Sequence, residues 1–240
     1  MKPIVLGLGA ALALTVMAPA AKACEIGKDD VIALWPGVAD MPTTRVQTLA
    51  PAINPRSYTP GEALPKGCKV RWKTDNRYGA IADNKLTIKP GTPDGTELTV
   101  TGEIRTTGGV RKVEGKLYVI DMALHPTVGN WSQQSISCPM QGMEGTPLRE
   151  LIFKARGDFE ATWMPFETYV DYWGKYVFDP ATGTLTLTPT GGNHVPDDAT
   201  LSGTIKVEGN TMTTKGLSFG QPNGSALPPD CEIVFKRAGT

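Results

Sequence analysis

Two of the acidic side chains inside the most aromatic stretch of the sequence could act together on a sugar. Glu167 and Asp171 interleave with aromatic residues between positions 153 and 178. Paired carboxylates supply the acid and the base of glycoside hydrolysis, whereas aromatic faces with a few polar groups are typical of pockets for small ligands. The stretch therefore predicts a binding site, with a hydrolytic site as the alternative. The candidate ligand-binding residues are Phe166, Glu167, Tyr169, Asp171, Tyr172 and Trp173.

The same aromatic residues also have a purely structural interpretation. Phe159, Ala161 and Trp163 alternate with polar neighbours, so we expect them to point into a core. The segment 165–172 lacks this clean alternation and is typical of a lid or a corner. It can either line a site at the mouth of a barrel or plug the end of that barrel.

Other catalytic arrangements are not indicated by the sequence. The two histidines, His125 and His194, lie in polar, proline-containing stretches and are expected to be solvated loop residues rather than bases held by an acid. The nucleophile-elbow, zinc-protease, phosphate-loop, dinucleotide-binding and EF-hand motifs are missing from the sequence. No catalytic residue and no cofactor is therefore assigned.

Four cysteines, Cys24, Cys68, Cys138 and Cys231, predict two disulfides if the chain is exported. Three connectivities are possible, and spacing alone does not choose among them. A Cys-x-x-Cys pair is missing and both histidines are far from every cysteine in the sequence, so we predict no metal site. The division into two domains, described below, favours Cys24–Cys68 and Cys138–Cys231.

The N-terminus has the pattern of a secretory signal peptide. Lys2 precedes an apolar run over residues 4–18, and Ala21 and Ala23 supply the small residues that a signal peptidase reads. We predict cleavage after Ala23 and a secreted or periplasmic protein, because the run is too short to span a bilayer comfortably and no other transmembrane segment is indicated. Cys24 after the cut leaves lipidation as an alternative, although the charged Lys22 departs from the lipoprotein pattern.

Charge and composition describe a folded, nearly neutral chain. Lys and Arg total 24, Asp and Glu total 24, and 40% of the residues are hydrophobic. A chain with balanced charges lacks the excess of positive charge that is typical of proteins that bind nucleic acid or an anionic membrane. We therefore expect a small ligand or another protein of the cell envelope as the partner, and the oligomeric state is not predicted.

In the first half of the chain, apolar and polar residues alternate with a period of two. Short runs of this kind, separated by turns such as residues 91–95 and 107–109, predict an antiparallel β-sandwich. The inward positions are expected to be Val70, Trp72, Leu86, Ile88, Leu98, Val100, Ile104, Leu117 and Val119.

This half resembles the bacterial Ig-like repeat over residues 25–121. The resemblance rests on the runs 70–76, 80–82, 85–88 and 95–100, with Trp72 on a strand and Gly95-Thr96 opening the next strand. The resemblance implies an Ig-like sandwich that serves as a spacer or adhesion module, with no catalytic residues.

The second half predicts about eight strands in an up-and-down barrel, beginning near Trp131. It is similar to lipocalin-like, calycin-type barrels over residues 127–237, through Gly129 and Trp131, through Phe159 after a Gly-Asp turn, and through the run 172–176. Because the segment is short for a full lipocalin, a filled barrel is an alternative to a hollow one. The expected division is a signal peptide (1–23), an Ig-like sandwich (24–124) and a lipocalin-like barrel (125–240).

Taken together, these patterns predict an exported all-β protein with an Ig-like β-sandwich and a small antiparallel lipocalin-like barrel. The leading hypothesis is non-enzymatic binding of a small apolar or sugar-like ligand at the barrel mouth, or of an envelope protein. An inhibitor or structural envelope protein, and a hydrolase using Glu167 and Asp171, are the alternatives.

Overall fold

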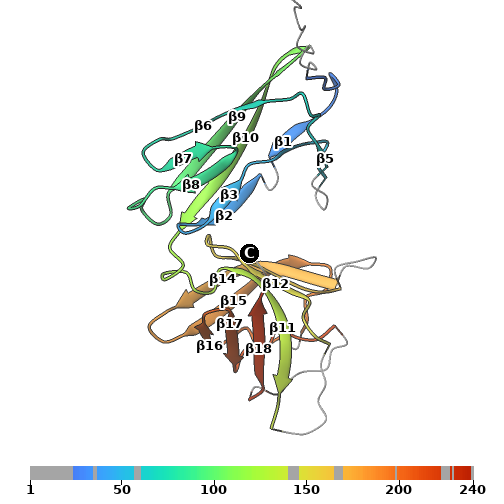
Figure 1. Cartoon of the computed structure of the whole chain (residues 1–240). Helices are drawn as coiled ribbons and strands as arrows, with labels where there is room; N and C mark the ends of the chain where they lie inside the picture. The colour runs from blue at the N-terminus through green and yellow to red at the C-terminus, as the bar shows by residue number, and fades with distance from the viewer. Residues whose placement is uncertain are drawn as a thin grey trace, which may run out of the picture.

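The described part of the chain is all-β, as the alternating sequence predicts. This computed structural model describes residues 24–34, 37–56, 61–139, 146–164, 170–197, 199–222, 228 and 230–238. Figure 1 shows two bodies joined end to end, the first built from strands β1 to β10 and the second from β11 to β18. Within these ranges, no helix has the length and apolar character needed to cross a bilayer. The predicted signal peptide, residues 1–23, lies outside the described residues.

Three small sheets make up the first body. A four-stranded sheet has the order β2–β10–β9–β6, and two three-stranded sheets have the orders β1–β4–β5 and β3–β8–β7. The strands are β1 (Ile32–Leu34), β2 (Val38–Pro42), β3 (Val46–Thr48), β4 (Pro51–Ile53), β5 (Glu62–Ala63), β6 (Val70–Thr74), β7 (Gly79–Ala82), β8 (Lys85–Ile88), β9 (Glu97–Thr106) and β10 (Gly109–Ile120). The pairing differs from a purely antiparallel sandwich in one place, because β2 runs parallel to β10.

The core of this body follows the predicted alternation. Leu98, Val100 and Ile104 of β9 are fully buried, and Leu117 and Val119 of β10 pack in the same cluster. Successive residues of a strand point to opposite faces, so the polar residues between them face outward. A disulfide between Cys24 and Cys68 ties the N-terminal segment to this core, as expected.

Trp72 covers the edge of this core rather than its centre. The residue is half-buried and pairs across strands with Gly102. A side-chain carbon on Gly102 would lie 2.8 Å from the indole, so only glycine lets the ring lie against β9. The indole N–H donates to Asn84 Oδ1 at 2.8 Å, which satisfies the polar end of the ring at the surface.

The second body is a closed barrel of eight strands, each paired antiparallel with its neighbours in chain order. Its first and last strands pair with each other and so close the barrel. This confirms the predicted up-and-down meander. The strands are β11 (Gly129–Ser137), β12 (Glu150–Phe153), β13 (Asp158–Met164), β14 (Val170–Asp179), β15 (Thr184–Gly192), β16 (Ser202–Glu208), β17 (Thr211–Lys215) and β18 (Glu232–Arg237).

Large side chains fill the inside of the barrel. Trp131, Phe153, Phe159, Trp163 and Phe235 are at most 2% exposed and belong to one hydrophobic cluster. The inward orientation predicted for Phe159 and Trp163 is therefore confirmed. Burial of such large aromatic surfaces is a main source of stability in a small barrel, and it takes up the space that a lipocalin-type cavity would need.

The second disulfide joins the two strands that close the barrel. Cys138 follows β11 directly and Cys231 directly precedes β18, next to the paired residues Ser137 and Glu232. The disulfide therefore adds a covalent link at the end of the pairing between the first and last strands. The expected Cys138–Cys231 pairing is confirmed, and two disulfides indicate an oxidising, extracytoplasmic environment.

Truncation of two tryptophans of the barrel should destabilise the protein to very different degrees. Trp163 is 2% exposed and Trp173 is 47% exposed. We expect Trp163→Ala to lower the free energy of unfolding by about 3–5 kcal/mol, as core truncations do, and Trp173→Ala to lower it by less than about 1 kcal/mol. Urea denaturation of both variants measures the difference, and equal midpoints would contradict the assignment of Trp163 to the core.

The barrel disulfide should contribute more stability than the sandwich disulfide. The bonds span 93 and 44 residues of sequence, respectively. Under the chain-entropy model, we expect loss of the longer loop in a Cys138→Ser, Cys231→Ser double variant to cost about 4–5 kcal/mol, and loss of the shorter loop to cost roughly 0.5 kcal/mol less. Guanidinium unfolding without reductant tests this, and a wild-type midpoint in the barrel variant would overturn it.

Candidate functional site

The residues predicted to form a site at the barrel mouth do not share one face where they are described. Phe166, Glu167 and Tyr169 lie outside the described residues. Asp171, Tyr172 and Trp173 are consecutive residues of β14, so their side chains alternate between the two faces of the barrel wall. Tyr172 is turned inward, whereas Asp171 and Trp173 are turned outward.

Tyr172 is a core residue of the barrel. Its side chain is 0% exposed and stacks on Trp163 with ring centroids 5.7 Å apart. Phe159 meets the same ring edge-on, and the hydroxyl group donates to the carbonyl oxygen of Phe219 at 2.9 Å. With its ring packed and its hydroxyl group bonded, Tyr172 presents no exposed surface to a ligand.

Trp173 lies on the outer surface of the barrel. Its indole packs over Gly191 of the neighbouring strand, where a side-chain carbon would come within 3.0 Å of the ring. Gly174, the next residue, allows a close backbone approach, because a side-chain carbon there would lie 2.1 Å from the carbonyl oxygen of Thr188. Asp171 is half-buried, and its backbone pairs with the loop that contains Asn193.

Both histidines make contacts that their loop positions did not predict. His194 is half-buried beside Trp163, with ring centroids 6.0 Å apart, and its Nε2 lies 3.4 Å from the carbonyl oxygen of Gln221. His125 pairs through Nε2 with Asp94 at 2.9 Å. The expectation of two solvated loop histidines is thereby corrected, since each helps to pack or to hold a loop.

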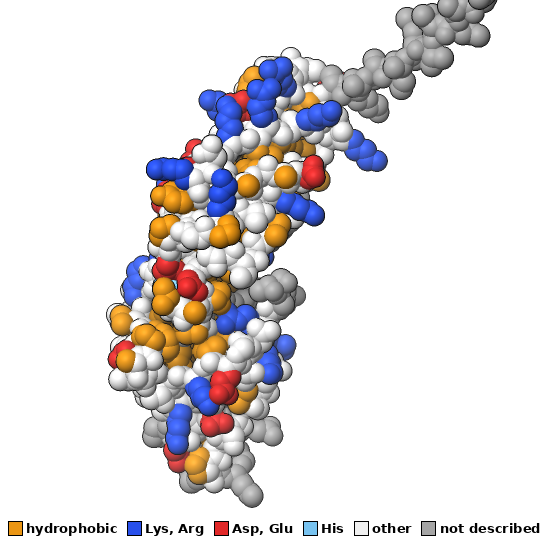
Figure 2. Space-filling model, turned by 60° about the vertical axis from the view of Figure 1, so that its left-hand side comes forward, with side chains coloured by type: hydrophobic (Ala, Val, Ile, Leu, Met, Phe, Trp, Pro, Cys, Tyr) orange, Lys and Arg blue, Asp and Glu red, His pale blue; other side chains and the backbone are white. Residues whose placement is uncertain are grey.

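A groove between the two bodies is the larger candidate site. It has a volume of about 990 Å³ and is lined by side chains from both bodies and from the segment that joins them. The lining residues are Asp40, Pro42, Thr44, Arg45, Ile120, Met122, Pro126, Val128, Gly129, Asn130, Ile152, Phe153, Lys154, Val207, Gly209, Asn210, Arg237 and Ala238. On the face drawn in Figure 2, hydrophobic side chains also gather on the part of the barrel nearest the sandwich.

Direct contacts fix the two walls of this groove. Asp40 Oδ2 on β2 accepts the backbone N–H of Ala155 at 2.9 Å. The guanidinium group of Arg156 lies over the ring of Tyr118, 4.3 Å from its centroid. Both contacts join the four-stranded sheet of the sandwich to the turn between β12 and β13. The groove is therefore bounded by elements that touch directly.

The joining segment, residues 121–128, is held to the sandwich by one carboxylate. Asp94 accepts the backbone N–H of Asp121 at 2.7 Å through one oxygen and pairs with His125 through the other. Burial acts to raise the pKa of Asp94, but these two hydrogen bonds outweigh it, so the pKa lies below the ordinary value of 3.8. The carboxylate therefore stabilises the start of this segment most strongly when it is ionised.

On the barrel side, the same segment is held by Arg237 at the end of β18. One guanidinium nitrogen donates to the carbonyl oxygen of Pro126 at 2.8 Å, and the other donates to that of Val128. The guanidinium plane lies over the indole of Trp131, 4.2 Å from its centroid. The indole N–H in turn donates to the carbonyl oxygen of Thr127 at 2.8 Å. Three successive carbonyl groups of the segment are thus bonded to the barrel.

Charges in the groove are mostly positive. Arg45, Lys154 and Arg237 line it, against the single acid Asp40 among the described lining residues. Lys154 is paired with Glu160 at 2.5 Å. Burial lowers the pKa of Arg237, and within the described ranges no carboxylate pairs with its guanidinium group. Arg237 is therefore a partly desolvated cation held in place by carbonyl groups and an indole.

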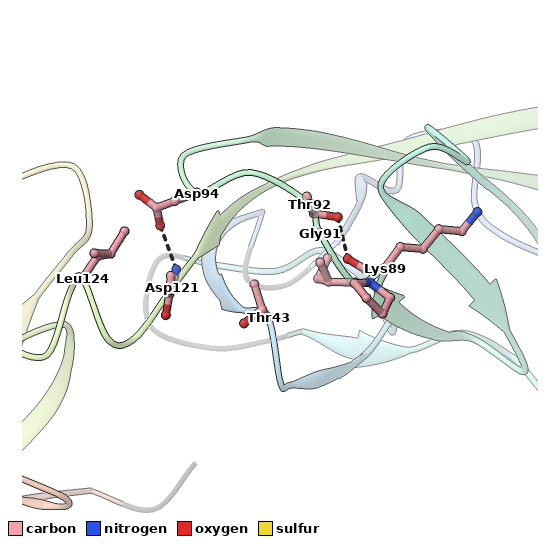
Figure 3. A pocket seen from close by; sticks show the side chains of 9 residues that line it. Thr43, Lys89, Gly91, Thr92, Asp94, Asp121 and Leu124 are labelled. Carbon is pink, nitrogen blue, oxygen red and sulfur yellow. Dashed lines mark hydrogen bonds between the residues drawn. The ribbon is translucent and has the colours of Figure 1, made fainter.

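A second pocket of about 560 Å³ lies on the sandwich near the joining segment (Figure 3). Its polar groups are occupied by local bonds. Asp94 accepts the N–H of Asp121, and the Thr92 hydroxyl group donates to the Lys89 carbonyl oxygen at 2.7 Å. These bonds stabilise turns, so this pocket is a weaker candidate than the groove.

The groove is not among the sites that the sequence predicts. The sequence does not mark Arg237 as a site residue, because a cation at the end of a strand is common. A general indication was available, since ligand sites occur preferentially where two domains meet. Within the described residues, no group of three or more His, Cys, Asp or Glu side chains could hold a metal ion.

Comparisons with known proteins return nothing for this chain: no family model, no curated protein and no solved structure matches it.

The Asp94 contact predicts a specific acid sensitivity. Because the pKa of the folded state is lowered, the stabilisation is complete above the ordinary pKa and is lost as the pH falls through the folded value. We expect the wild type to lose stability more steeply than Asp94→Asn below about pH 4. Urea midpoints between pH 6 and pH 2.5 measure this, with the exposed Asp29→Asn as the control. Parallel curves for wild type and Asp94→Asn would remove Asp94 from this role.

Proposed function

We propose that the chain is an exported, non-enzymatic binding protein whose ligand lies in the groove between the sandwich and the barrel. One observation carries the proposal: a groove of about 990 Å³, lined with apolar side chains from both bodies, lies where they meet. The expected signal peptide, cleaved after Ala23, and the two disulfides support a periplasmic or secreted location.

The groove suits a small molecule better than the inside of the barrel does. Its volume lies at the upper end of the range of about 300–1,000 Å³ that small-ligand pockets span. Ile120, Val128, Ile152 and Val207 supply its apolar walls. The barrel interior is instead packed with aromatic rings. The lipocalin-like barrel thus serves in this proposal as one wall of the site, and the Ig-like sandwich serves as the other.

The lining supports binding rather than hydrolysis. Glycoside hydrolysis requires two carboxyl groups on either side of the scissile bond. Asp40 is the one acid among the described lining residues, and its Oδ2 already accepts the N–H of Ala155. Asp171, the described member of the predicted carboxylate pair, belongs to the outer surface of β14 and not to the groove.

A second candidate is an interaction with another envelope protein through the outer face of β14. Trp173 and Val177 are 47% and 71% exposed, and both lie on the outward side of this strand. The exposed Lys175 lies between them on the same face, and apolar and aromatic side chains exposed on one face favour a protein contact. The bacterial Ig-like resemblance, which implies a spacer or adhesion module, points the same way.

Binding can be tested with a neutral, environment-sensitive apolar dye such as Nile red. Ile152 lines the groove and is half-buried. We expect Ile152→Asn to raise the dissociation constant about five- to tenfold, because the loss of apolar contact is worth about 1 kcal/mol. Fluorescence titration of the purified mature protein is the measurement.

Val177→Asn is the matched control, because it removes an exposed apolar side chain from the same barrel but not from the groove. Absence of saturable dye binding by the wild type would overturn the groove as the site. So would a loss in Val177→Asn as large as that in Ile152→Asn, and this second result would favour the outer face of β14.

A further inference from the structure

Two of the three cations that line the groove, Arg45 and Arg237, form no ion pair with an acid of the described chain. Asp40 is bonded to the backbone of Ala155, and Lys154 is paired with Glu160. Within the described ranges, the side chains of Arg45 and Arg237 have no carboxylate partner. Two guanidinium groups, one on the sandwich and one on the barrel, are therefore available at a site that is otherwise largely apolar.

Arg237 is also oriented before any ligand arrives. Its two carbonyl contacts and the indole of Trp131 hold the guanidinium plane in one position. A guanidinium group carries five N–H donors, and these contacts use two of them. Partial burial removes water from the charge without supplying an anion, which is the situation in which an incoming carboxylate or phosphate is bound most strongly.

From this juxtaposition we infer that the ligand of the groove is an anionic amphiphile. Its carboxylate or phosphate head pairs with Arg237 and Arg45, and its apolar body lies against residues such as Val128, Ile152 and Val207. The inference rests on the proposed function and specifies the chemical class of its ligand. The shared chemistry is an acidic oxygen head on an apolar body, whether the head is a carboxylate or a phosphate.

The class of ligand can be tested by displacing bound Nile red with probes of equal chain length. The probes are decanoate, decyl phosphate, neutral decanol and decyltrimethylammonium. We expect the two anions to displace the dye at concentrations at least tenfold lower than decanol does, and the cation to be the weakest. Added salt should reduce the difference in displacing concentration between the anions and decanol, because ions screen the charge of a partly open groove. The two anionic arms distinguish a carboxylate head from a phosphate head.

Two substitutions test the residues. The side chain of Arg45 is exposed and bonds to no described residue, so Arg45→Ala leaves the joining segment intact. We expect it to reduce the preference for anions over decanol at least threefold. Arg237→Lys keeps the charge but loses the planar fork, and we expect a larger reduction. Lys206→Ala, an exposed cation of the barrel outside the groove, should leave the preference unchanged.

The outcomes separate this inference from the proposed function. Equal displacement by decanoate, decyl phosphate and decanol would overturn the anionic class while leaving the groove as a binding site. Failure of Nile red and of every probe to bind would overturn both. Full anion preference in Arg45→Ala and in Arg237→Lys would overturn the assignment to these residues.

Discussion

The placement of the two bodies depends on the contact between the Arg237 guanidinium group and the segment that joins them. This side chain binds the carbonyl oxygens of Pro126 and Val128 while it lies on the indole of Trp131. Asp94 holds the other end of the segment against the sandwich. Without these bonds, several backbone groups of the segment would lose their partners, at a cost of about 1–3 kcal/mol for each one left buried. The groove is held by this connection, bonded at both of its ends, together with the direct contacts of Asp40 with Ala155 and of Arg156 with Tyr118.

Packing inside the barrel explains why the proposed site lies outside it. Tyr172, Trp163 and Phe159 stack against one another, and the Tyr172 hydroxyl group bonds to Phe219. The interior of an eight-stranded barrel can either be filled by its own side chains or hold one small ligand, and here side chains fill it. A barrel filled in this way gains stability and stiffness, and its outer wall and ends become the surfaces that can meet a ligand or a partner.

Alternation in the sequence predicted strands from residue 70 onward but not the short strands β1 to β5 before it. The even cysteine count with the two-domain division led to both disulfides. Leu98, Val100 and Trp163 are inward because a strand has a period of two, which is a local property. The parallel pairing of β2 with β10, the burial of Tyr172 and the groove depend instead on which distant segments meet. Arg237 illustrates the limit: its partners are 109 and 111 residues away in sequence, and no local pattern connects them.

The position of Arg237 at the end of β18 also imposes an order on assembly. The sandwich strands all precede residue 121, so that body can fold while later residues are still being synthesised or exported. Neither the seam between β11 and β18 nor the bonds to Pro126 and Val128 can form until the last strand has arrived. Until β18 pairs with β11, the barrel is open and Arg237 does not hold the joining segment. Pairing of β18 with β11 both closes the barrel and brings Arg237 to the carbonyl groups of the joining segment.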